Sequence, residues 1–187
     1  MGIFGMKRVK PRRCKSCKES FLPLRPLQSV CSPKCAHDLT LANKAKLQKR
    51  EDGERKEALK TRTEYAKEAQ QATNAYVRER DKDRPCISCG RYHDGQWHAG
   101  HYISTGARPS LRYHADTNIH RQCAPCNTHL SGNLINYRIR LVELLGQEIV
   151  EGLESDHTIR KYTKDELIEI RDFYRAELKR LKRESND

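Results

Sequence analysis

The eight cysteines are the feature that most constrains how this chain can fold. They form four close pairs, Cys14–Cys17, Cys31–Cys35, Cys86–Cys89 and Cys123–Cys126. Two such pairs together supply the four thiolates that fill a tetrahedral zinc site, and no cysteine is left over. We therefore expect two structural Zn2+ ions, one for each set of four cysteines. A disulfide framework is the alternative, and a reducing compartment disfavours it.

The composition explains why such a chain would need metal. Of its 187 residues, 36% are hydrophobic and 33% are charged, so a single large apolar core is not expected. No apolar run is long enough to span a membrane, and no apolar segment follows the basic N-terminus as it would in a signal peptide. We therefore expect a cytoplasmic protein without a membrane partner.

The net charge of +12 is unevenly distributed along the chain. Residues 1–84 carry 22 Lys and Arg against 11 Asp and Glu, which makes this half the candidate for binding a polyanion. Nucleic acid is favoured over a membrane surface because the basic half lacks an apolar helix face. A merely solvated arm is the alternative. The candidate DNA contacts are Arg12, Arg13, Lys15, Arg78, Arg80, Arg84, Arg108 and Arg112.

The pattern of charge, proline and apolar residues predicts a mostly helical α+β protein in four segments. Residues 1–37 form a basic tail and a zinc knuckle, and 38–84 form a charged helical arm whose first half is solvated or partly disordered. Residues 85–146 hold the second set of cysteines, and 147–187 are helical. The N-terminal knuckle could grip a phosphate backbone or a partner protein, or be only structural.

Two capping boxes predict where long helices begin. The box Thr61-x-x-Glu64 precedes an apolar face that we expect to pack on the zinc core, namely Tyr65, Ala69, Ala72 and Tyr76. The box Thr163-x-x-Glu166 opens a helix running to about Arg183.

Shorter elements are expected between these two helices. Residues 96–104 and 111–114 look like two strands, joined by residues 105–110. A helix is expected to start at 123–130, and amphipathic helices are expected at 136–145 and 147–153.

The 33 residues between Cys89 and Cys123 are rich in histidine. Because four thiolates leave zinc no open position, any catalysis must come from other residues. The polar candidates are His93, His98, His101, His114, Asn118 and His120, followed by Asn127 and His129. We assign His93 and His114 to structural roles, and we expect Trp97 to pack on the zinc core.

The order CISCG, AGHY, NIH and CAPCN resembles the HNH endonucleases, especially the group related to phage recombination endonuclease VII. The motifs GHY, LRY…NIHRQC and CN…SGN are also similar to the NinG (Rap) recombination proteins of lambdoid phages, along essentially the whole chain. This likeness is strongest over Cys86–Gly146.

That resemblance implies a fold, an activity and partners. The fold is a small ββα-metal, treble-clef-like core at residues 85–146 with helical arms. The activity is a structure-selective nuclease cutting D-loops and Holliday junctions in the cytoplasm of the phage's bacterial host. Other recombination proteins are candidate partners. A homodimer is expected because a four-way junction has approximate two-fold symmetry.

The resemblance also assigns residue roles. His101 would be the general base, Asn118 would brace the loop that orients it, and Asn127 would bind a catalytic Mg2+ or Mn2+. The family usually has an Asp or His directly before the base, where this chain has Gly100. A bulge at Gly100 could bring His98 beside His101. Otherwise His120, His129 or a carboxylate elsewhere must complete the site.

Two other functions fit the same sequence. One is a non-catalytic, zinc-containing DNA-binding accessory or regulatory protein that uses the basic half of the chain. The other is a protein-interaction module. Activity on branched DNA separates the first of these from a nuclease, and strongly salt-dependent DNA binding would argue against the second.

Overall fold

A computed structural model describes residues 10–185, so the first nine residues of the predicted basic tail lie outside the described residues. The chain divides into two compact units, Met1–Leu59 and Lys60–Asp187. The segment predicted as one charged arm, 38–84, contains most of one helix in the first unit and all of another in the second.

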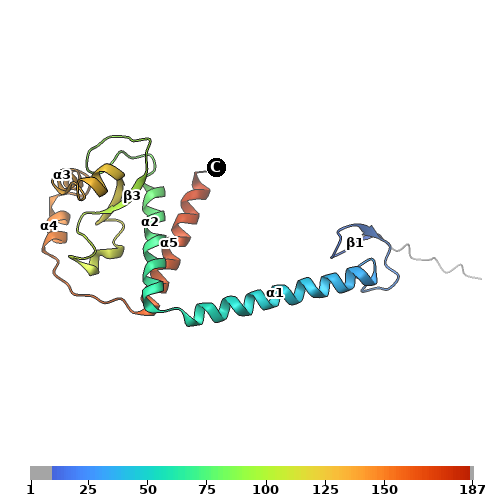
Figure 1. The fold of residues 1–187 in the computed structure, drawn as a ribbon. Coiled ribbons are helices and arrows are strands. Elements are labelled where there is room, and N and C mark those ends of the chain that lie inside the picture. The colour runs from blue at the N-terminus through green and yellow to red at the C-terminus, as the bar shows by residue number, and fades with distance from the viewer. Residues whose placement is uncertain (1–9, 186–187) are drawn as a thin grey trace, which may run out of the picture. The chain divides into compact units, whose positions relative to one another are not determined.

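The first unit contains a small hairpin followed by a long helix. Strands β1 (Arg12–Arg13) and β2 (Ser20–Phe21) pair antiparallel. Helix α1 (Pro33–Leu59) is one continuous helix (Figure 1). The Ser32 hydroxyl accepts a hydrogen bond from the backbone N–H of Cys35 at 3.2 Å, as expected of an N-cap before a proline. Cys35 is the only buried residue of α1, so this charged helix is solvated along its length.

The second unit holds the remaining elements. In chain order they are α2 (Arg62–Arg80), β3 (Trp97–His101), the 3-10 helix η1 (Pro109–Tyr113), β4 (Ile119–Cys123), the π-helical turn η2 (Pro125–His129), α3 (Leu134–Leu145), α4 (Gln147–Ser155) and α5 (Lys164–Glu184). Strands β3 and β4 form an antiparallel pair, from Trp97 opposite Cys123 to His101 opposite Ile119.

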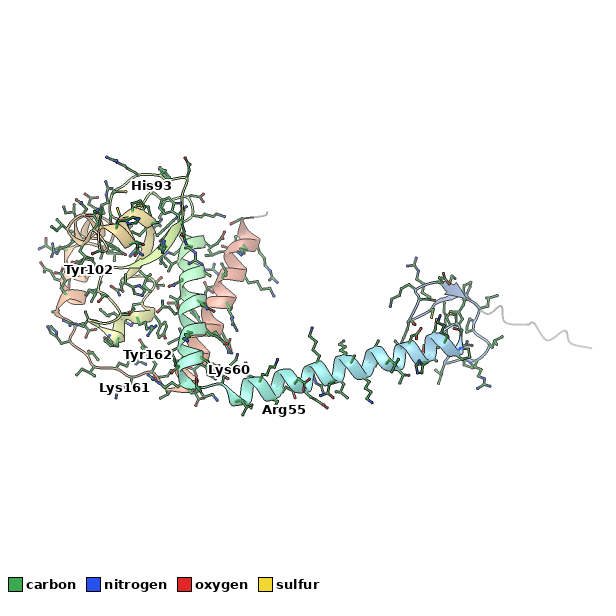
Figure 2. The ribbon with its side chains drawn as sticks, in the orientation of Figure 1. Arg55, Lys60, His93, Tyr102, Lys161 and Tyr162 are labelled. Atoms are coloured by element: carbon green, nitrogen blue, oxygen red, sulfur yellow. The ribbon has the colours of Figure 1, made fainter. Side chains whose placement is uncertain are left out.

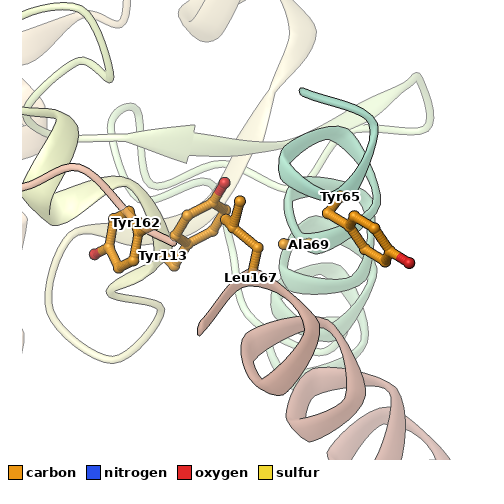
Figure 3. Packing of buried hydrophobic residues seen from close by; sticks show 5 residues of the cluster. All are labelled: Tyr65, Ala69, Tyr113, Tyr162 and Leu167. Carbon is orange, nitrogen blue, oxygen red and sulfur yellow. The ribbon is translucent and has the colours of Figure 1, made fainter. Parts of the chain in front are cut away.

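Helices α2 and α5 pack along each other, and both begin with the predicted capping box (Figure 1). Tyr65 and Ala69 of α2 belong to one buried cluster with Tyr113, Tyr162 and Leu167 (Figure 3). The apolar face of α2 therefore packs on α5 and on residues 113–119, whereas the expected contact was with the zinc core.

Two buried tyrosines, one on α5 and one just before it, connect this part of the chain to the middle of the unit. Tyr162 and Tyr174 donate hydrogen bonds to the carbonyls of Ser110 and Tyr113, at 2.5 and 2.7 Å. Each buried hydroxyl thereby gains a partner, so burying these large rings leaves no polar group unsatisfied. These contacts hold the 109–113 segment against α5.

The predicted strand at 111–114 is wrong. These residues lie mostly in η1, and the strand that pairs with β3 is β4. Pro109 sits in the first turn of η1, where a fixed φ favours a helical turn. The helix expected at 123–130 is a single π-helical turn, whereas the helices expected at 136–145 and 147–153 are present as α3 and α4.

A third cluster lies under η1, where α3 and α4 contribute Tyr137, Leu141, Val150 and Leu153 around Leu111. Gly146 separates the two helices with φ of 89°, a conformation that glycine adopts without strain. Among helices in residues 10–185, none has the length and apolar character needed to cross a membrane.

We predict that Leu167→Ala destabilises the second unit by about 2–5 kcal/mol, because it removes a fully buried side chain from the α2–α5 cluster. Ile159→Ala is the matched control: this aliphatic side chain is 94% exposed, and its loss should change stability by less than about 0.5 kcal/mol. Urea unfolding of both variants measures the difference. Equal effects would contradict the assigned core.

Candidate metal centres and cleft

Both sets of four cysteines converge in the structure. Within each set the four sulfur atoms lie within 4.8 Å of one another, as the spacing predicted. Four thiolates at such separations suit tetrahedral Zn2+, so both clusters could bind zinc. Among residues 10–185, no other group of three or more His, Cys, Asp or Glu side chains comes as close.

The two clusters are built on the same turn. In the first, the backbone N–H of Lys18 donates to the carbonyl of Cys14 at 3.0 Å, and in the second Gly90 donates to Cys86 at 2.8 Å. Lys18 and Gly90 both have a left-handed conformation, with φ of 66° and 67°. The repeated Cys-x-x-Cys pattern therefore forms the same backbone turn in both clusters.

A second feature is also common to both clusters. The backbone N–H of the third cysteine points at the sulfur of the first, Cys31 to Cys14 and Cys123 to Cys86, at 3.4 Å in each case. Such N–H···S contacts stabilise a thiolate and orient it as a ligand. Both clusters thus have the surroundings expected of metal-bound sulfur.

Polar and aromatic neighbours surround the second cluster. Trp97 packs against it, as predicted, and donates its indole N–H to the carbonyl of His93 at 3.1 Å. The Nε2 of His93 lies 3.3 Å from the sulfur of Cys89, within reach to donate to it. His93, which precedes β3, therefore supports the cluster, in keeping with its assigned structural role (Figure 2).

His101 and Asn127 line the same cleft, which has a volume of about 580 Å³. His101 ends β3, and Asn127 lies in the π-helical turn after β4. Tyr102, Arg108 and Glu154 also border this cleft. Of the three residues expected to be catalytic, two therefore meet at one surface, and the third lies buried beside the loop that borders it.

That third residue, Asn118, is fully buried and closes the loop between β3 and η1. Its Oδ1 accepts from the backbone N–H of Ile103 at 2.8 Å. Its Nδ2 donates to the carbonyls of Ile103 and Leu111, at 3.0 and 3.1 Å. One amide thus fastens both ends of the 103–111 segment, which is the bracing geometry expected of this position.

His101 has a defined tautomer in this arrangement. Its Nε2 lies 3.1 Å from the carbonyl oxygen of Arg112, the residue that follows Leu111. A carbonyl only accepts hydrogen bonds, so Nε2 carries the proton and Nδ1 keeps its lone pair. Burial lowers the pKa of His101 below its ordinary value of 6.5, which favours the neutral imidazole at pH 7.

The structure accounts for the glycine that precedes His101. A Cβ atom at Gly100 would lie 2.1 Å from Oε1 of Gln122. The Gln122 side chain is held there by hydrogen bonds from its Nε2 to Ser88 Oγ and the Gly132 carbonyl, both at 2.6 Å. Gln122 therefore occupies the space that an Asp or His at position 100 would need.

The other histidines considered as metal ligands lie away from the cleft. Pairing of β3 with β4 is continuous, so no bulge forms at Gly100 to bring His98 beside His101. His120 is buried near the Tyr137 hydroxyl, at 3.3 Å, and burial lowers its pKa to about 4. His129 is exposed. Of the four candidate ligands, the cleft therefore contains Asn127.

A carboxylate borders the cleft; the sequence left room for one elsewhere in the chain but did not identify which residue supplies it. Glu154 of α4 forms an ion pair with Arg138 at 2.7 Å and accepts a hydrogen bond from the Tyr102 hydroxyl. Arg138 first and Tyr102 second lower its pKa, so the carboxylate is ionised at neutral pH. Glu154 lies outside the segment bounded by the cysteines, and no motif there marks it.

The candidate DNA contacts of the second unit divide into two groups. Arg108 borders the cleft and is oriented by the carbonyl of Asp156 at 2.6 Å. Arg112 contributes the carbonyl beside His101 and donates its Nε to Gln70 at 2.8 Å. These two arginines lie next to the sequence-predicted site.

The remaining candidates lie elsewhere. The guanidinium of Arg80 is largely buried and forms a two-pronged ion pair with Asp81, both contacts at 2.7 Å. The Arg80 side chain therefore has a structural role in this ion pair. The side chains of Arg78 and Arg84 are exposed, and in the first unit so are those of Arg12, Arg13 and Lys15.

The fold and its clusters define a class of small protein in which two four-cysteine centres support short hairpins and long helices. The chain matches the family described as Bacteriophage Lambda NinG protein over residues 6–184. It is 42% identical to Protein ninG of Escherichia phage lambda, over 95% of this chain and 96% of that protein. It is 43% identical to Protein ninG of Salmonella phage P22, over 95% and 97%. The chain therefore belongs to the NinG family, which confirms the resemblance to the NinG proteins.

The comparison with solved structures found no match to this chain.

We predict two zinc ions per chain by elemental analysis, retained when Mg2+ is removed by mild EDTA treatment. Cys31→Ser and Cys123→Ser should each lower the content to one, because each removes one thiolate from a different cluster. Ser16→Ala, between two ligands of the first cluster, should keep both ions. A wild-type content of one or none would contradict the assignment of two centres.

Proposed function

We propose that this protein is a metal-dependent DNA endonuclease of the HNH type that cuts branched recombination intermediates such as D-loops and Holliday junctions. One observation carries the proposal. His101 and Asn127 border a single cleft, and buried Asn118 fastens the adjacent loop, in the roles that the HNH resemblance assigns to these positions. The three residues are separated in sequence and come from a strand end, a loop and a turn.

The order of elements supports the same proposal. Strand β3 supplies the histidine, the loop before β4 supplies the bracing asparagine, and the turn after Cys126 supplies the second asparagine. A ββα-metal core at residues 85–146 would place its base and its metal ligand in this way. The helical turn that carries Asn127 is the five-residue η2.

Proton transfer would fall to His101. Its Nδ1 is the unprotonated nitrogen, so it can take a proton from a water molecule attacking the scissile phosphorus. The hydrogen bond from Nε2 to the Arg112 carbonyl fixes the ring and stabilises the imidazolium that forms. Breaking the bond from phosphorus to the 3′ oxygen, which takes a proton from solvent water, then leaves a 3′-hydroxyl and a 5′-phosphate.

The cleft offers oxygen donors for a hard cation, namely the Asn127 amide and the Glu154 carboxylate. Mg2+ and Mn2+ bind such oxygen sets, and Mg2+ often uses one or two protein ligands together with waters and substrate phosphates. When bound, such an ion would neutralise charge that develops on the phosphate. Arg108 borders the same cleft and could hold a neighbouring phosphate.

A second candidate function is a non-catalytic, zinc-containing DNA-binding accessory or regulatory protein. The observation that favours it is Gly100, where Gln122 takes the place of the family's usual metal ligand. Under either function we propose branched DNA as partner, together with other recombination proteins. A homodimer would match the two-fold symmetry of a four-way junction.

The proposal predicts cutting of a labelled four-way junction with Mg2+ or Mn2+. His101→Ala should lower the rate by about 100-fold or more, because it removes the general base. Asn127→Ala should also lower it, and excess metal should partly restore activity if the amide binds the cation. His129→Ala is the control, since His129 is exposed and does not border the cleft.

The zinc-loaded wild type separates the two candidate functions. A protein that binds the junction but never cuts it, with either metal, would rule out the nuclease and favour the accessory protein. Equal rates for wild type and His101→Ala would show that any activity in the preparation has another source.

A further inference from the structure

The first unit presents leucines to solvent on one short loop. Leu22, Leu24 and Leu27 are 64%, 91% and 94% exposed, and all three lie between β2 and α1. Single exposed leucines are common on protein surfaces, but several within six residues form an apolar patch that usually marks a binding surface. This loop is accordingly a candidate for contact with another molecule.

The loop is held in place by hydrogen bonds. The guanidinium of Arg12 donates to the carbonyl of Pro26 at 2.6 Å. The Gln28 side chain accepts from the backbone N–H of Leu24 at 2.7 Å and donates to the Val30 carbonyl at 2.9 Å. A loop braced in this way loses little conformational freedom on binding, so its leucines are pre-organised for contact.

Positive charge surrounds these leucines. Residues 10–34 contain one acidic residue, Glu19, against seven basic ones. These seven are Lys10, Arg12, Arg13, Lys15, Lys18, Arg25 and Lys34. A hollow of about 480 Å³ next to Leu24 is lined by Lys10, Arg12 and Arg25 together with Pro23 and Pro26. An apolar tip within a basic rim complements a polyanion that also offers apolar faces, and nucleic acid combines phosphates with stacked bases.

We infer that the Leu22–Leu27 loop is a wedge that enters the base stack of DNA at a branch point, while the basic rim holds the flanking phosphates. Apolar side chains of DNA-binding proteins insert between base steps at a cost of a few kcal/mol of unstacking. At a branch the stack is already interrupted, so this cost is lower than in an intact duplex. The loop would thereby confer a preference for branched DNA from outside the cleft.

This inference rests on the proposed function in taking DNA as the ligand, but it does not require cleavage. It assigns branch preference to the first unit and hydrolysis to the second. An experiment can therefore refute the wedge without refuting the nuclease, or refute the nuclease without refuting the wedge.

The test uses the full-length, zinc-loaded chain carrying His101→Ala. The probe is a four-way junction with 2-aminopurine at the branch, and a linear duplex of the same sequence is the reference. We expect fluorescence to rise on binding as the base unstacks. Leu24→Ser with Leu27→Ser should abolish this rise and weaken junction binding by about tenfold, with duplex binding and its salt dependence unchanged.

Two further variants serve as controls. Leu41→Ser with Leu47→Ser removes two exposed leucines from α1 of the same unit and should leave binding and fluorescence unchanged. Arg13→Ala with Lys15→Ala should weaken junction and duplex binding alike, and should reduce the slope of log affinity against log salt by about 1 to 2. Zinc content verifies that each variant keeps its clusters.

An unchanged junction-to-duplex ratio, or an unchanged fluorescence rise, in Leu24→Ser with Leu27→Ser would overturn the wedge and leave the leucines as a surface for a protein partner. Leucine-dependent fluorescence, together with a wild-type protein that binds the junction but never cuts it, would support the wedge and refute the nuclease. Cutting by wild type, together with junction binding that does not depend on the leucines, would support the nuclease and refute the wedge.

Discussion

The candidate site depends on the hydrogen bonds of one buried amide. Asn118 binds the backbone at Ile103 and at Leu111, so the two ends of the intervening loop are fixed to each other. That closure sets the position of the next carbonyl, at Arg112, to which His101 donates. The orientation of the ring, its tautomer and its unprotonated nitrogen all follow from this chain of contacts.

The second cysteine cluster holds the elements that carry those contacts. Cys123 is the last residue of β4 and Cys86 follows the end of α2, so one cluster joins strand and helix. Backbone hydrogen bonds from Ile87 to Arg121 and from Ala124 to Gln96 align the knuckle with the hairpin, both at 3.0 Å. Because the chain has few apolar residues, this linkage supplies part of the stability that a larger apolar core would provide.

The features that could be predicted are those with a local cause. A Cys-x-x-Cys pair and a capping box each occupy a few residues whose chemistry does not depend on the rest of the fold, and both were found where expected. The HNH resemblance assigned Asn118 to bracing a loop, and its side chain binds the backbone at Ile103 and Leu111; its part in any reaction stays a prediction.

The features that could not be predicted depend on contacts distant in sequence. Residues 111–114 alternate like a strand, yet η1 is stabilised by the side chains of Asn118, Tyr162 and Tyr174. Position 100 has no room for a side chain, because the Gln122 side chain on the neighbouring strand fills that space. Glu154 reaches the cleft from a later helix, so no local pattern marks it.

The most direct test of this account is the protonation state of His101, measured by long-range proton–nitrogen NMR during a pH titration. The account predicts a neutral ring with its proton on Nε2 and a pKa below 6.5, and loss of that single tautomer in Asn118→Ala. A proton on Nδ1, or a tautomer unaffected by Asn118→Ala, would contradict it.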